Sequence, residues 1–101
     1  MAKLSLKANP TFIASVSIPV AGSEPALVEF TFKHRTRDEL QAWLKSEKTD
    51  AVAITDMAIA WDLAEPLNVE SAEVLVQNYF GSARAVLDAY LEELTAAKRK
   101  N

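Results

Sequence analysis

The residues that could carry out chemistry are few and scattered along this 101-residue chain. Its single histidine, His34, follows a strand-like segment and has no second histidine with which to build a metal site. The chain has no cysteine, so disulfides, thiolate zinc sites and a thiol nucleophile are excluded. Its two glycines, Gly22 and Gly81, stand far apart and cannot form a glycine-rich phosphate loop. We therefore expect no catalytic residue, no metal and no cofactor.

The fourteen Asp and Glu residues are the remaining candidates for acid–base chemistry. They occur at helical spacing and at helix starts, which is typical of solvated faces and caps. Pairs such as Glu70 and Glu73 have no surrounding apolar pattern that would raise a pKa toward the range of a general acid. The sequence thus indicates a protein that is not an enzyme.

Charge is distributed unevenly, with a net value of −3. Residues 38–97 hold twelve acidic and three basic residues, whereas residues 1–37 hold five basic and two acidic ones. An acidic body repels phosphate backbones, so a small nucleic-acid-binding regulator acting through Lys33, Arg35, Arg37 and the basic tail is the least favoured function. The N-terminus lacks the apolar run of a signal peptide, and no stretch approaches the ~20 apolar residues of a membrane span. We expect a cytoplasmic protein.

Two segments near the N-terminus alternate with the period of a half-buried strand. The first covers residues 11–20 and the second residues 27–34, and a turn-forming stretch, residues 21–25, joins them. This pattern predicts an antiparallel β-hairpin. Leu4 and Leu6 could add a short third strand.

After His34 the apolar period changes to that of helices. Thr36 and Glu39 fit a capping box, which predicts a helix over about 37–46 that buries Leu40, Trp43 and Leu44. A second helix should start at Thr49 or Asp50 and run to about Asp62.

A third helix is expected after Asn68 or Ser71, with Leu75, Val76 and Tyr79 on one side. Gly81 would end it through a positive φ, and Ser82 would cap a fourth helix over about 83–98. The predicted fold is α+β, a single domain over 1–101. It comprises a hairpin region (1–35), a helical region (36–98) with three or four helices packed on the hairpin, and a basic tail (99–101).

The second predicted helix carries apolar residues on two opposed sides. Val52, Ile59 and Leu63 share one side, and Ile54, Met57 and Trp61 gather on the other. Such a helix is either sandwiched inside its own domain or docks a helix from another chain. We expect partner contacts from the following residues: Ile54, Met57, Trp61, Leu63 and Phe80.

Several segments resemble the small tail assembly chaperones of long-tailed bacteriophages and prophages. The similarity spans nearly the whole chain, and none of the shared strings is a mechanistic motif. The segments are residues 4–12 (LSLKANPTF), 16–22 (VSIPVAG), 28–35 (VEFTFKHR), 37–40 (RDEL), 61–63 (WDL) and 77–79 (QNY).

This resemblance implies a non-enzymatic protein of the bacterial cytoplasm. Such chaperones bind the tape measure protein, a long and largely helical chain, keep it soluble and help recruit the major tail protein around it. Family members are often made in a short and a frameshift-extended form, and this chain would correspond to the short form or to the shared N-terminal part. The alternative is a structural adaptor or self-associating module of the phage particle, in which the same apolar stripe closes a homo-oligomer.

Overall fold

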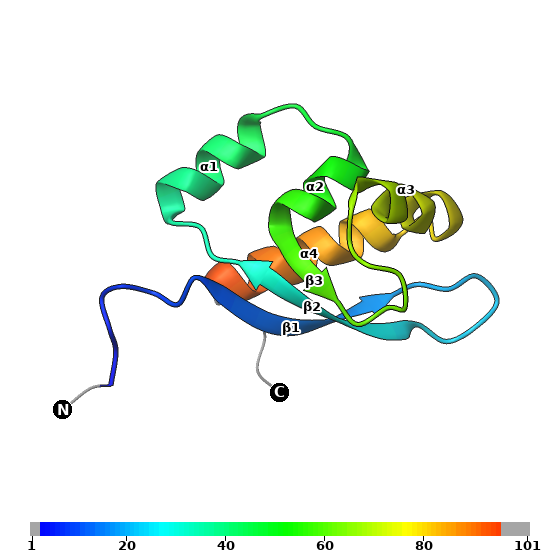
Figure 1. The fold of residues 1–101 in the computed structure, drawn as a ribbon, viewed down its shortest axis with the longest axis horizontal. Coiled ribbons are helices and arrows are strands. Elements are labelled where there is room, and N and C mark those ends of the chain that lie inside the picture. The colour runs from blue at the N-terminus through cyan, green and yellow to red at the C-terminus, as the bar shows by residue number, and fades with distance from the viewer. Residues whose placement is uncertain (1–2, 96–101) are drawn as a thin grey trace.

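The computed structural model describes residues 3–95 as a three-stranded antiparallel sheet with four helices gathered on one side (Figure 1). The strand order is β1-β2-β3. This arrangement confirms the predicted α+β fold with an N-terminal hairpin. The elements in chain order are β1 (Thr11–Ile18), β2 (Ala26–Lys33), α1 (Arg37–Lys45), α2 (Asp50–Met57), β3 (Ala58–Trp61), α3 (Val69–Asn78) and α4 (Ser82–Thr95).

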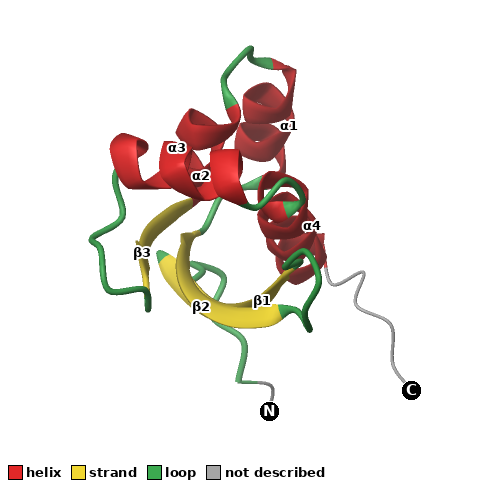
Figure 2. Ribbon diagram, turned by 90° about the vertical axis from the view of Figure 1, so that its right-hand side faces the viewer, coloured by secondary structure: helices red, strands yellow, loops and turns green. Residues whose placement is uncertain are grey.

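The predicted hairpin is confirmed. β1 and β2 pair from Thr11↔Lys33 to Ile18↔Ala26. Every second residue points toward the helices, and the fully buried aromatic pair Phe30 and Phe32 stacks with ring centroids 5.5 Å apart. The opposite side of the sheet is open to solvent, as in other antiparallel sheets with one buried face (Figure 2).

The third strand is not where the sequence pattern placed it. Leu4 and Leu6 are exposed and lie outside the sheet. Instead, Ala58–Trp61 pairs antiparallel with β2, with a bulge at Ile59. The second helix therefore ends at Met57 and not at about Asp62. The prediction that one helix over residues 52–63 carries two opposed apolar sides is wrong for the residues after Met57. The edge of β2 that β1 leaves free supplies hydrogen-bond partners for the backbone of residues 58–61, and the apolar pattern of these residues alone does not reveal this pairing.

The first two helix starts agree with the expected caps. The backbone N–H of Thr36 donates to Oε1 of Glu39 (2.8 Å), and the Glu39 N–H donates to Oγ1 of Thr36 (3.2 Å). The backbone bond lowers the pKa of the Glu39 carboxyl below its ordinary value. Thr49 caps α2. Leu44 is 45% exposed, so its predicted burial is wrong, because α1 lies at the periphery and buries no residue completely.

Gly81 and Ser82 lie between α3 and α4 as expected, but their structural roles differ from the predicted ones. Asn68 caps α3 as expected. Gly81 does not adopt a positive φ; it lies so close to Pro19 that a Cβ there would be 3.0 Å from Cγ of the proline. Ser82 is the first residue of α4, not its cap, and its buried hydroxyl has no hydrogen-bond partner among the described residues. The predicted continuation of this helix to 98 and the basic tail lie outside the described residues.

A polar network ties α4 to the end of β2. The buried Tyr90 hydroxyl donates to the carbonyl oxygen of Lys33 (2.8 Å) and accepts from Nη1 of Arg35 (2.9 Å). The same Arg35 nitrogen donates to the carbonyl oxygen of Asp56 (3.0 Å), and Nε1 of Trp43 donates to Oδ2 of Asp56 (2.9 Å). Burial raises the pKa of the Tyr90 hydroxyl above its ordinary value. These bonds connect α1, α2 and α4 to the end of β2.

Candidate functional site

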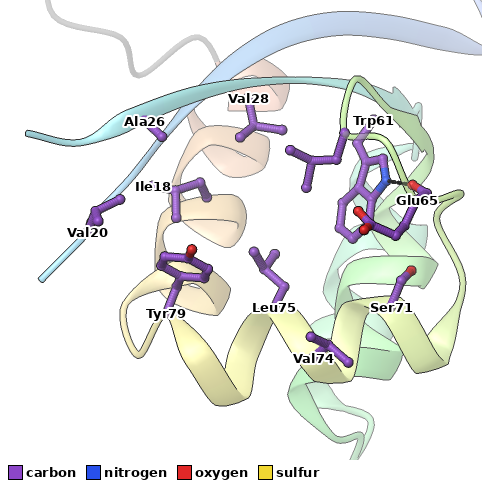
Figure 3. A pocket seen from close by; sticks show the side chains of 11 residues that line it. Ile18, Val20, Ala26, Val28, Trp61, Glu65, Ser71, Val74, Leu75 and Tyr79 are labelled. Carbon is purple, nitrogen blue, oxygen red and sulfur yellow. Dashed lines mark hydrogen bonds between the residues drawn. The ribbon is translucent and has the colours of Figure 1, made fainter.

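An apolar groove opens at the other end of the fold, between the hairpin end of the sheet and α3 (Figure 3). Its volume is about 490 Å³, which is in the range of pockets that bind a ligand or a short segment of a partner. The lining residues are Ile18, Val20, Ala26, Val28, Trp61, Leu63, Glu65, Ser71, Val74, Leu75 and Tyr79.

The sheet forms one wall of this groove. Ile18 and Val28 are buried and face inward, so that the core of the fold continues into the floor of the groove. Trp61 packs edge-on against Phe30, with ring centroids 5.9 Å apart at 79°. This contact fixes the indole at the mouth of the groove, beside the labelled side chains of Val28 and Glu65 (Figure 3).

The loop after β3 is held to the sheet by hydrogen bonds at its first residue and at Glu65. The Glu29 backbone N–H donates to Oδ1 of Asp62 (2.9 Å), and the Asp62 N–H donates to the Glu29 carbonyl oxygen (3.0 Å). Nε1 of Trp61 donates to the carbonyl oxygen of Glu65 (2.6 Å). These bonds place Leu63 and Glu65 along the groove.

Helix α3 forms the opposite wall. Ala72 and Leu75 bury its inner side, while Val74 is 60% exposed and Tyr79 39% exposed along the groove. The hydroxyl of Ser71 is already engaged, because it donates to the Pro66 carbonyl oxygen (2.7 Å) and accepts from the Asn68 N–H (3.0 Å). The wall thus offers apolar contact and few free polar atoms.

A second, smaller hollow of about 360 Å³ lies between α1, α2 and α4. It is lined by charged as well as apolar side chains, and Nζ of Lys48 donates to the Trp43 carbonyl oxygen there (2.7 Å). The lining residues are Trp43, Leu44, Lys48, Asp50, Ala53, Met57, Phe80, Ala83, Arg84 and Leu87.

The five predicted partner-binding residues do not share one surface. Trp61 and Leu63 line the groove, whereas Met57 and Phe80 line the second hollow. Phe80 is 93% exposed, but Met57 and Ile54 are both fully buried in the core. Their role in partner binding stays a prediction, and the structure gives Trp61, Leu63 and Phe80 the accessible positions.

Val74 also lines the groove and was outside the predicted set of contact residues. The sequence signal for this wall is the apolar residue at position 74. Ala72 and Leu75 already form the buried side of α3, so Val74 is an additional apolar side chain. The contribution of Ile18 and Val28 to the groove had no separate signal, because both fit the core stripe of a strand.

No three His, Cys, Asp or Glu side chains in residues 3–95 could hold a metal ion together. His34 is exposed on the segment that follows β2. None of the helices in the described range is long and apolar enough to cross a membrane.

The fold and the groove define a small α+β protein with an apolar groove between its sheet and α3. The sequence matches the phage tail assembly chaperone family over residues 1–101, and the chain therefore belongs to that family. Membership supports a chaperone role in tail assembly and suggests a non-enzymatic one. No match was found among curated proteins or among solved structures.

Proposed function

We propose that this protein binds the tape measure protein in the cytoplasm of the bacterial host, keeps it soluble and helps recruit the major tail protein around it. The observation that carries this proposal is the family match over the whole chain. The apolar groove supports it, because a chaperone for a long helical chain needs a surface that covers apolar side chains reversibly.

This role requires several weak contacts with the partner rather than one tight binding site. A partner that must be released as the tube polymerises should be held by several weak contacts, and an apolar groove with few free polar atoms is suited to such a contact. The proposed function requires no bond-making chemistry.

Co-expression with the tape measure protein encoded by the same phage or prophage tests this proposal. We expect the tape measure protein to move from the pellet to the supernatant and to co-purify with the chaperone. A tape measure protein that stays equally insoluble with and without the chaperone would contradict the proposed role. Addition of the major tail protein to the soluble complex should then release the chaperone as tubes form.

A structural adaptor that self-associates is the second candidate, and the open side of the sheet favours it. Ile13 and Leu27 are 63% and 74% exposed there, and Leu4 and Leu6 are exposed on the segment before β1. Light scattering should then show an oligomer, and purified particles should contain the protein. A monomer that is missing from finished particles would leave the chaperone role alone.

A further inference from the structure

We infer that the groove between the sheet and α3 takes an amphipathic helix whose apolar side chains are flanked by lysine or arginine. This inference rests on the proposed function and names the partner segment that the groove selects. It follows from three properties of the groove: its side-chain walls, its occupied polar atoms and the charge of the elements that build it.

The walls favour a helix over an extended segment. An added strand needs a free row of backbone donors and acceptors. The groove lies over the inward face of the sheet, and its sheet wall consists of side chains such as Ile18 and Val28 rather than of the outer edges of β1 and β3. The partner must therefore satisfy its own backbone hydrogen bonds, which a helix does.

The polar atoms at the groove are largely committed to the protein itself. The Trp61 indole N–H is bonded to the Glu65 carbonyl oxygen, and the Ser71 hydroxyl is bonded to the backbone at Pro66 and Asn68. What remains for a partner is apolar surface, the Tyr79 hydroxyl and the Glu65 carboxylate. Apolar side chains at positions i, i+4 and i+7 of a helix suit such a channel.

The one charged residue among those that line the groove is acidic, Glu65, and no lysine, arginine or histidine lines it. Every lining residue comes from two stretches of sequence, residues 8–32 and 49–83, which contain no lysine, arginine or histidine. Glu70 and Glu73 lie on α3, the helix that forms one wall, and Asp62 lies in the same loop as Glu65. Lysine or arginine beside the apolar anchors of a partner would complement this field, and acidic residues would be repelled.

The second hollow lacks this selectivity. Lys48, Asp50 and Arg84 line it together, so its local charge is mixed. Its basic side chains would oppose a lysine-flanked segment at short range. The groove and not the second hollow is thus the site for a basic amphipathic helix.

Designed peptides of about 15 residues, long enough for helix formation, provide the probe. The first carries leucine at i, i+4 and i+7 with lysine on the flanks. The second replaces each lysine with glutamate, and the third keeps the lysines but replaces each leucine with serine. We expect the first peptide to bind the full chain at least about tenfold more tightly than either of the others, a difference of about 1.4 kcal/mol. Equal binding of the lysine and glutamate peptides would overturn the charge requirement.

Nuclear magnetic resonance spectra of the complex locate the peptide. Amide shifts should concentrate at Ala26, Val28 and Leu75 in the groove, and the amides of Ala53 and Ala83 in the second hollow should stay unchanged. The opposite pattern would place the peptide in the second hollow and refute the assignment.

Two lysine substitutions, at similarly exposed apolar positions, distinguish an effect at the groove from an effect of the protein's net charge. Val74→Lys introduces a positive charge at the groove, where the side chain is 60% exposed, and should weaken binding of the lysine peptide at least about tenfold. Ile13→Lys makes the same change on the open side of the sheet, where the side chain is 63% exposed, and should leave binding within about twofold. Equal weakening by both substitutions would show that only net charge matters.

The same two variants distinguish this inference from the proposed function. If the wild-type protein solubilises the tape measure protein and Val74→Lys does not, both stand. If Val74→Lys and Ile13→Lys solubilise it equally well, the chaperone role holds and the groove is not its binding site. If the wild-type protein fails to solubilise it while the lysine peptide still binds at the groove, the proposed partner is wrong and the groove's preference remains.

Discussion

Nε1 of Trp61 donates a hydrogen bond of 2.6 Å to the carbonyl oxygen of Glu65, four residues further along the chain. The bond folds the loop after β3 back on itself and sets one rim of the groove. Trp61 thus connects the core, through its edge-on contact with Phe30, to the surface that we propose binds a partner.

Replacing Trp61 with phenylalanine should loosen this rim. Trp61→Phe keeps an aromatic ring against Phe30 but removes the indole donor, and the loss of one partly exposed hydrogen bond costs about 1 kcal/mol. We expect faster hydrogen exchange of the amides in residues 62–65. Trp43→Phe is the matched control, since it removes a different indole bond, to Asp56, and should leave exchange in this loop unchanged.

Removing the Tyr90 hydroxyl should destabilise the polar network that ties α4 to the end of β2. Tyr90→Phe leaves the Lys33 carbonyl oxygen and the Arg35 guanidinium without this partner, so the free energy of unfolding should fall by about 1–3 kcal/mol. Urea unfolding measures the change. Tyr79→Phe, at a half-exposed position on the groove, should stay within about 0.5 kcal/mol of the wild type. Similar losses for both variants would show that the buried network adds nothing.

The stability of the protein should fall at alkaline pH because of the same hydroxyl. Burial holds the pKa of Tyr90 above its ordinary value of 10.0, so the unfolded chain releases this proton at a lower pH than the folded chain. The contribution of the protonated Tyr90 hydroxyl to the free energy of unfolding is complete below pH 10. It is lost as the pH rises through the higher pKa of the folded state. The difference in unfolding free energy between wild type and Tyr90→Phe should therefore shrink between pH 8 and pH 11. A constant difference would contradict the raised pKa.

Disruption of the capping box should fray α1. Thr36→Ala removes the side-chain acceptor of the Glu39 N–H and should lower the free energy of unfolding by about 1 kcal/mol. Thr36→Ser keeps a hydroxyl acceptor and is the matched control. The Glu39 pKa is lowered by the backbone bond from Thr36, so the cap contributes fully above the ordinary carboxyl value of 4.5 and weakens as the pH falls through the lower pKa. Circular dichroism and amide exchange over residues 37–45 report the fraying.

Much of the fold followed from the sequence because it depends on neighbours along the chain. The alternation of β1 and β2, the caps at Thr36, Thr49 and Asn68, and the buried stripe of Val86 and Tyr90 on α4 are all set by local geometry and apolar periodicity. The family resemblance was also visible in the sequence and was confirmed by the match over residues 1–101.

Only the tertiary structure decided the ending of α2 and the origin of the third strand. The segment Ala58–Trp61 continues the apolar pattern of a helix, but the unpaired edge of β2 captures it as a strand. That edge lies almost thirty residues earlier in the sequence, so no local pattern contains the information. The same long-range pairing brings Trp61 opposite Phe30 and, with α3, forms the groove. Local periodicity therefore determined the elements, and non-local backbone pairing determined the surface that they build.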